Sequence, residues 1–575
     1  MVARKLALFL VCLLGMAVGS ASAQSEARIR VVLPSIEHDE NALKWLIEQS
    51  PSADLKKQWK KLKSDVINAF TQGVDLSKPI EVDIVFRKDD MAYEFRVPLA
   101  KLNGPDGFIE FMEGLGYKVK PVVPGVLTFF EIAEKGKKPV YLRFDKDYAW
   151  VSPLKAAVPP NPPAATGDME PLLGLKKDVV ADLKNDAEGL EGRRENFREL
   201  RKQFEALIKF HRNEDKNAFE LRKLALTQQL DEAERFVVES ETFQVNWITS
   251  ISEASPTGRG EISLTALAGT DLLKSLQEFA VKPSYFANVQ LHPAPLVVGK
   301  LTFPLDALRV QHVKDFYKAV RPTLETEIDA RAGKTDAQKT ATKQAMNKFL
   351  DMLDAGASLG VVDSFIDTHA VEPGKNVMVC GIRAADGKVA DEIIKLLPAI
   401  KAEWQVKPHS EHGGVSIHEL TVPKARLESF QRIFAGETAL YVGTSKDAVW
   451  GAAGVDALKH LATAIDQVAQ PAPEKVDPVV ISYQVQVAKL VTLLEILQKE
   501  APALNAPKTK EQIKEQKDIE KYRKLAQDAM GDCNSLLRGE LRRTDNKIEG
   551  FLELNECVLR YIGSMIADGV KVTLQ

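Results

Sequence analysis

The chain has 575 residues and a formal net charge of −3; 45% of its residues are hydrophobic and 27% are charged. This composition is ordinary for a soluble globular protein, and the length allows about two to four domains. A broad basic surface is not implied, which argues against a nucleic-acid-binding protein.

Residues 1–23 have the pattern of a secretory signal segment. Arg4 and Lys5 precede an apolar run at 6–18, and small residues around Ala23 form a cleavage site. Cleavage would change the net charge from −3 to −5, since the two basic residues leave with the segment. We therefore expect an exported protein, periplasmic or secreted, with no transmembrane segment after signal removal.

Residues 24–152 predict an N-terminal α+β domain. Along 80–86 apolar residues alternate with Glu81 and Asp83, and 91–97 alternates in the same way. This pattern is typical of antiparallel strands with one face on a core and the other towards solvent. Glu81 and Asp83 are therefore expected on the polar face.

The proline-rich segment 153–171 predicts a linker or an exposed loop. The next segment, 172–241, has apolar residues at helical spacing among many charges. Arg194 and Arg201 occupy two positions of its apolar seam, which argues against a long coiled coil. Two arrangements remain open: a helical, coiled-coil-like hairpin that turns near Asn213, and a single helix on the main body.

Residues 242–470 predict a duplicated α+β domain, with repeats at about 243–320 and 359–435. Each repeat reads as a hairpin, an amphipathic helix and a strand that ends at a proline before another helix. The N-terminal domain is a candidate third copy whose landmarks come in the opposite order. The sequence matches are Val281-Lys282-Pro283 with Val406-Lys407-Pro408, Leu301-Thr302-Phe303-Pro304 with Leu420-Thr421-Val422-Pro423, and Val119-Lys120-Pro121 in the N-terminal domain.

The C-terminal region, 471–575, predicts a strand, a helix and a final hairpin. If the hairpin turn centres on Asp545, Cys533 and Cys557 lie equally far from it and face each other. Opposed strand positions are close to disulfide-bonding distance, and an exported protein reaches an oxidising compartment. The sequence therefore predicts a disulfide between them, which a one-residue register shift would prevent.

Histidines gather in one segment, where His409, His412 and His418 stand beside Glu411 and Glu419. Imidazole and carboxylate groups suit zinc or copper, so these three histidines are the metal-site candidates. The segment contains glycines and has no HExxH motif, which favours a solvated hairpin tip over a metal site.

Other local motifs give little support for catalysis. Gly333-Lys334-Thr335 lacks the upstream glycine of a phosphate-binding loop, because Ile328 stands at that position. Cys380 lies in a predicted buried strand, where a cysteine is usually inert. Catalytic and cofactor-binding residues are therefore not assigned, and no cofactor is expected.

The secretory signal, the repeated hairpin–helix units and the segment GELRRTDNKIEGFLELNECVLRYIG at 539–563 together resemble large uncharacterised secreted proteins of planctomycete-type bacteria. The resemblance covers most of the mature chain and contains no diagnostic motif. It implies an exported protein, and it implies no activity, ligand or site residue.

The patterns together predict an α+β protein of repeated antiparallel hairpin-plus-helix units, with sheets covered by helices on one face. The favoured function is a non-enzymatic binding or structural protein of the cell envelope, with an envelope protein or a small apolar ligand as partner. A carrier of an apolar ligand or lipid is one alternative. A hydrolase whose catalytic residues follow no local motif is another.

Overall fold

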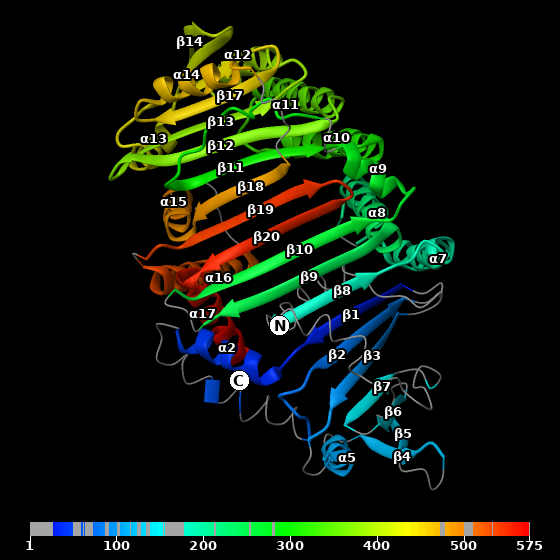
Figure 1. Ribbon diagram of the computed structural model, residues 1–575. Helices are drawn as coiled ribbons and strands as arrows, with labels where there is room; N and C mark the ends of the chain where they lie inside the picture. Colours follow the sequence, from blue (N-terminus) through cyan, green and yellow to red (C-terminus); the bar gives the residue numbers. More distant parts are fainter. Residues whose placement is uncertain are drawn as a thin grey trace.

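The computed structural model describes residues 27–49, 59–60, 63, 73–86, 91–100, 104–114, 117–123, 128–133, 139–145, 147–152, 155, 177–211, 214–251, 255–278, 282–471, 478–499, 510–531 and 533–573. Within them the chain is α+β, as the sequence predicts, with helices packed on a large antiparallel sheet (Figure 1). The expected signal segment, 1–23, lies outside the described residues, as does nearly all of 153–171.

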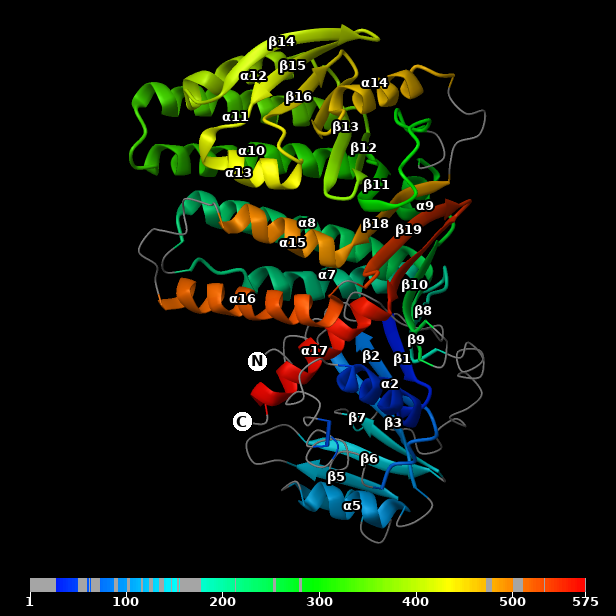
Figure 2. The same ribbon diagram turned by 90° about the vertical axis from the view of Figure 1, so that its left-hand side faces the viewer.

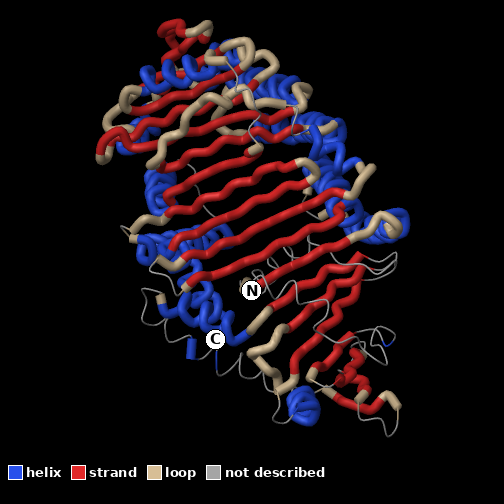
Figure 3. The backbone as a smooth tube through the Cα atoms, in the orientation of Figure 1, coloured by secondary structure: helices blue, strands red, loops and turns tan. Residues whose placement is uncertain are grey.

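The strands are β1 (Ala27–Leu33), β2 (Ile80–Phe86), β3 (Met91–Pro98), β4 (Lys118–Pro121), β5 (Phe129–Ala133), β6 (Val140–Asp145), β7 (Tyr148–Ser152), β8 (Val179–Lys184), β9 (Ser240–Ser250), β10 (Thr257–Ala266), β11 (Pro295–Pro304), β12 (Val361–Glu372), β13 (Lys375–Arg383), β14 (Gln405–His412), β15 (Val415–Thr421), β16 (Ala439–Thr444), β17 (Ala448–Gly454), β18 (Val479–Gln486), β19 (Leu536–Thr544) and β20 (Lys547–Asn555). All of them hydrogen-bond into one continuous sheet, and every neighbouring pair is antiparallel (Figure 3).

The helices are α2 (Ile36–Glu48), α5 (Gly104–Gly114), α7 (Leu190–Leu207), α8 (Lys216–Glu239), α9 (Asp271–Glu278), α10 (Ala307–Ala330), α11 (Asp336–Ala357), α12 (Val389–Ile400), α13 (Lys424–Ile433), α14 (Ala457–Val468), α15 (Val487–Lys499), α16 (Lys510–Met530) and α17 (Glu556–Thr573). Most of them lie on one side of the sheet, as predicted (Figure 2).

One end of the sheet departs from that prediction. Met378 packs with α13 and α15, whereas its neighbour Val379 packs with Leu461 and Ile465 of α14. Adjacent residues of a strand point to opposite faces, so α14 covers the second face. The expectation of helices on one face only is wrong here, because α14 and the loop 282–294 close another core on Phe365 and Trp450.

The sheet consists of two halves with the same strand order. The first half runs β10-β9-β8-β1-β2-β3-β7-β6-β5-β4. The second runs β20-β19-β18-β11-β12-β13-β17-β16-β15-β14, so each strand has a counterpart numbered ten later. The halves meet where β10 pairs with β20, with Ser263 opposite Glu549.

Local details repeat at matching points of the two halves. After β3 the backbone N–H of Leu99 donates to the carbonyl of Asp147 at 2.7 Å, and after β13 that of Ala384 donates to the carbonyl of Asp447 at 2.9 Å. Asp147 directly precedes β7, which pairs with β3, and Asp447 directly precedes β17, which pairs with β13. The identical residues around these points are Tyr141 and Tyr441, Lys146 and Lys446, Asp147 and Asp447, and Trp150 and Trp450.

The two halves defined by strand order are not the two repeats predicted from the sequence. In the segments 243–320 and 359–435, β11 pairs with β12 and β18, whereas β15 pairs with β14 and β16. The two segments share a strand that ends before a helix, and they do not share its neighbours. The counterpart of Val406-Lys407-Pro408 in β14 is Val119-Lys120-Pro121 in β4, the other edge strand.

The helical pairs α7–α8, α10–α11 and α15–α16 project from the helix-covered side of the sheet (Figure 2). Helices α7 and α8 pack together as a hairpin rather than forming a single helix. Residues 179–184, which were predicted to be helical, form strand β8 instead. Arg201 of α7 pairs with Asp231 of α8 at 2.6 Å. Helix α8 also bridges the halves, because Glu232 pairs with Arg309 of α10 at 2.6 Å.

Candidate functional site

A cleft of about 630 Å³ lies between α2 and the end of β9. Ligand sites in proteins commonly have volumes of this order. The lining residues from α2 are spaced along one side of the helix, and those from β9 and its continuation are consecutive. They are His38, Asn41, Lys44, Trp45 and Glu48, and Ile248, Thr249, Ser250 and Ile251.

The cleft exists because β9 is longer than its neighbour. Its last pair with β8 joins Trp247 to Val179, but it continues beside β10 as far as Ser250. Helix α2 occupies the space beyond β8. Its start is fixed by Ser35, whose side chain accepts a hydrogen bond from the N–H of His38 at 3.2 Å, which satisfies one free N–H of the first turn.

A buried carboxylate ties the two walls of the cleft together. Asp178 accepts the N–H of Thr249 at 2.6 Å on one oxygen and lies 3.0 Å from Nε2 of His38 on the other. Asp178 is buried, while His38 is exposed to the cleft. The carboxylate therefore holds the end of β9 and the first turn of α2 in a fixed relation.

A second acid, Asp39, lies beside this pair. Burial, and then repulsion from the Asp178 carboxylate, raise the pKa of Asp39 from 3.8 to about 7, against the influence of His38. Its Oδ1 is buried and has no hydrogen-bond partner among the described residues. Near neutral pH the Asp39 carboxyl is thus partly protonated beside a charged carboxylate, an arrangement that can give or take a proton.

Asp39→Asn is expected to change the pH dependence of stability. A carboxyl whose pKa is raised by folding stabilises the folded state fully below its unfolded pKa, and this contribution is lost as pH rises through the folded value. The contribution of Asp39 should therefore be lost between pH 3.8 and about 7 in the wild type. Asparagine cannot ionise, so unfolding midpoints measured from pH 5 to 8 should show the variant gaining on the wild type as pH rises. A constant difference would contradict the raised pKa.

A network of buried charges lies on the first half of the sheet, on the face opposite the helices. Nε of Arg30 lies 2.7 Å from Glu81 and 3.1 Å from Asp83, and Nη1 of Arg96 lies 2.9 Å from Glu81. The Arg96 guanidinium also lies 4.1 Å from the centre of the Trp150 ring. The expectation that Glu81 and Asp83 face solvent is wrong, because both are almost fully buried.

The second half has apolar side chains at the same lateral positions. Glu81, Arg96 and Trp150 are cross-strand partners in the first half, and Phe365, Gly381 and Trp450 are partners in the second. The ring of Phe286 covers Gly381 and lies 5.0 Å from Phe365 and 5.3 Å from Trp450. The two halves therefore share a frame and differ in the chemistry of this face.

Three histidines not singled out in the sequence gather on the second half. His292 stacks on His369 with ring centres 4.0 Å apart, and His460 lies 5.3 Å from His369. Nδ1 of His369 lies 2.8 Å from Asp367, which also accepts the N–H of His292. Burial, and then the neighbouring His369, lower the pKa of His460. The three come from a loop, a strand and a helix, so no sequence spacing links them.

The histidines chosen from the sequence do not come together. His409 lies beside Ser410, His412 lies 2.8 Å from Asp466 of α14, and His418 lies 2.9 Å from Asp391 of α12. The three histidines lie at separate points of the hairpin β14–β15, and each has its own hydrogen-bond partner. Among the described residues, no group of three or more His, Cys, Asp or Glu side chains could hold a metal ion.

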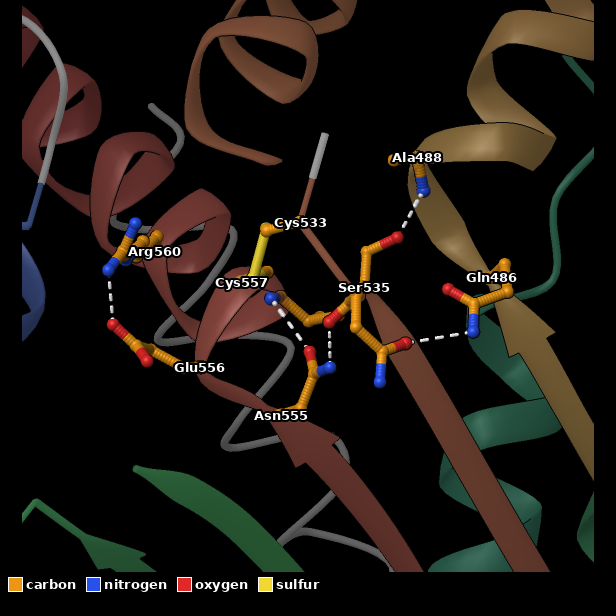
Figure 4. Close-up of a disulfide and its surroundings, with 10 residues drawn as sticks. Gln486, Ala488, Cys533, Ser535, Asn555, Glu556, Cys557 and Arg560 are labelled. Atoms are coloured by element: carbon orange, nitrogen blue, oxygen red, sulfur yellow. Dashed lines mark hydrogen bonds and ion pairs between the residues drawn. A yellow bond between two sulfur atoms is a disulfide. The ribbon is translucent and has the colours of Figure 1, made fainter. Parts of the chain in front are cut away.

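Cys533 and Cys557 form a disulfide with Cα atoms 6.4 Å apart (Figure 4). Its geometry differs from the predicted one. Strands β19 and β20 pair Thr544 with Lys547, one residue away from the expected register, and Cys557 lies in the first turn of α17. The bond thus joins the segment between α16 and β19 to the first turn of α17. Its sequence separation is 24, for which loop closure in the unfolded chain corresponds to about 3 kcal/mol of stabilisation.

The remaining sequence candidates serve structure. Burial raises the pKa of the Cys380 thiol in β13, which disfavours the reactive thiolate. Gly333 forms the turn between α10 and α11 with a positive φ of 74°, and Thr335 caps α11.

Comparison with protein-family models, with curated proteins and with solved structures gives no match. No described helix has the length and hydrophobicity needed to span a bilayer.

Proposed function

We propose that the protein is an exported binding protein of the cell envelope and that its ligand occupies the cleft between α2 and the end of β9. The observation that supports this most directly is the cleft of about 630 Å³, whose walls are held together by Asp178. Export is supported by the signal pattern at 1–23 and by the disulfide, a bond that persists in oxidising compartments.

The lining indicates the kind of ligand. Trp45 and the isoleucines at 248 and 251 offer apolar surface, and Asn41 and Ser250 offer hydrogen bonds. Lys44 and Glu48 add one charge of each sign. A small polar ligand with one apolar face would suit this combination. The cleft is open to solvent, a geometry that favours a surface ligand over enclosed carriage of an apolar one.

Filling the cleft tests this proposal. Asn41 is exposed, so Asn41→Trp should block the cleft without removing a core contact. Thr340→Trp on α11 is a matched control, because Thr340 is also exposed on a helix. After incubation with envelope extract, native mass spectrometry should find the same small molecule on the wild type and on Thr340→Trp, and at least about tenfold less on Asn41→Trp. Equal retention by the two variants, or no retention by any chain, would reject the cleft as the site.

A hydrolase is the second candidate, favoured by Asp39 and Asp178. A carboxyl whose pKa is raised towards neutrality, as burial does for Asp39, can serve as a general acid or base. In that case Asp39→Asn would retain the ligand but no longer turn it over. Unchanged turnover in Asp39→Asn would exclude this role for the pair.

A further inference from the structure

The loop 282–294, which precedes β11, covers an apolar face of the second half. We call this loop the strap. Phe286 of the strap is fully buried, and its ring lies over Gly381, where an added Cβ atom would come within 2.7 Å of it. The same ring contacts Phe365 and Trp450. The position of the strap therefore decides whether these aromatic side chains are open to solvent.

Two acids of β12 hold the strap at its two ends. Asp363 accepts the backbone N–H of Tyr285 near the first end. Four residues further along β12, Asp367 accepts the backbone N–H of His292 at 2.8 Å. The strap itself contains no acidic residue and no helix or strand. Its attachment at the second end therefore depends on a carboxylate that it does not supply.

At this second end the strap meets two further imidazole rings. His292 stacks on His369 of β12 with ring centres 4.0 Å apart, and His460 of α14 lies 5.3 Å from His369. Nδ1 of His369 lies 2.8 Å from Asp367. Asp367 thus serves His369 and the backbone of His292 at once, and its single charge can balance one imidazolium ion but not three.

The charges that face His460 do not favour its protonation. Burial, and then repulsion from His369, lower the pKa of His460 from 6.5, and Lys459 acts in the same direction. Asp456 and Asp367 oppose this shift without reversing it. A histidine whose pKa is lowered by folding stabilises the folded state fully above its unfolded pKa. The contribution of His460 is therefore lost as pH falls below 6.5.

We propose that the strap is a pH-sensitive closure, which acidification releases from β12. Imidazole rings gain charge as pH falls through the range in which histidine titrates. Charged rings 4.0 and 5.3 Å apart repel one another, and His369 and His460 are held in a strand and a helix. The strap is then the part that moves, and Phe286 leaves the apolar face with it. This proposal is independent of the cleft, which lies in the first half.

Hydrogen–deuterium exchange, read by mass spectrometry, tests the release with the mature chain, 24–575. The protection of amides in 284–294, corrected for the intrinsic effect of pH on exchange, should fall about tenfold or more from pH 7.5 to pH 5.5, as for a coupling of one pKa unit. Amides of α11 should keep their protection, since a local opening leaves the rest of the fold intact. A strap that stays protected at pH 5.5, or an equal loss in α11, would overturn the proposal.

A double variant tests whether the histidines cause the release. His292→Phe, His460→Phe keeps flat rings in the stack and leaves His369 alone with Asp367. Its strap should have the same protection at both pH values. His409→Phe is the control, because His409 is an exposed histidine of the same half outside this cluster. Its strap should respond to pH as in the wild type.

A wild-type response in the double variant, or a lost response in His409→Phe, would contradict the histidine origin of the release. If the double variant is already unprotected at pH 7.5, the single variant His460→Phe decides the question. Its strap should lose less protection on acidification than the wild type, and a loss as large as in the wild type would overturn the proposal.

Discussion

Replacing Arg96 by Met is expected to lower the free energy of unfolding by about 3–5 kcal/mol. The Arg96 side chain is 7% exposed, lies 2.9 Å from Glu81 and stacks on Trp150. Without it, Glu81 shares Arg30 with Asp83 in the buried network. Methionine has a similar length, so the loss comes mainly from a buried charge that is no longer compensated rather than from a cavity.

Two further variants separate this cause from general destabilisation. Adding Glu81→Gln to Arg96→Met should recover part of the loss, because the stranded negative charge is removed. Arg538→Met breaks an ion pair with Glu553 whose arginine is 46% exposed, so it should cost no more than about 1 kcal/mol. Guanidinium unfolding at pH 8 is the suitable measurement, since burial and Asp83 raise the pKa of Glu81 to about 7 and leave it mostly ionised there. Equal losses in Arg96→Met and Arg538→Met would contradict the buried network.

The sequence predicted where helices and strands occur better than it predicted which strands pair with one another. Alternation along 80–86 and 91–97 identified β2 and β3, because a two-residue period is a local property. The pairing of β11 with β18, or of β10 with β20, depends on contacts between residues far apart in the chain. Repeats matched by local motifs were for this reason assigned to segments whose strands have different neighbours.

Strand β8 shows a related limit. Its residues, Val179–Lys184, directly precede a long amphipathic pattern and were predicted to be helical with it. The segment is a strand because β1 and β9 offer it two edges. Tertiary pairing outweighs a short segment's local preference.

The candidate site was beyond local sequence reasoning. His38 and Asp178 are 140 residues apart and meet only because α2 crosses the end of β8. The alternation around Glu81 correctly separated two faces, but it carries no information on what covers the polar one. The disulfide was proposed from a symmetric hairpin, and the cysteines instead meet because α17 begins directly after β20.

Two ten-stranded halves form one sheet through the pairing of β10 with β20. The cleft belongs to the first half, and the α7–α8 hairpin of that half contacts the second half through the pair of Glu232 and Arg309. A sheet continuous across this junction holds the cleft and the second half in a fixed relation. If β10 and β20 did not pair, the two halves would be separate domains, and their shared strand order would say nothing about the assembled protein.

Disulfide trapping across the junction tests this claim most directly. Ser263 of β10 and Glu549 of β20 are directly opposed, and Arg542 of β19 lies one strand further on. Mild oxidation of Ser263→Cys, Glu549→Cys should give nearly complete cross-linking, read by peptide mapping without reduction. Ser263→Cys, Arg542→Cys should give almost none, since two strand spacings, about 10 Å, exceed the reach of a disulfide. Cross-linking of the second pair, or none in the first, would contradict the continuous sheet.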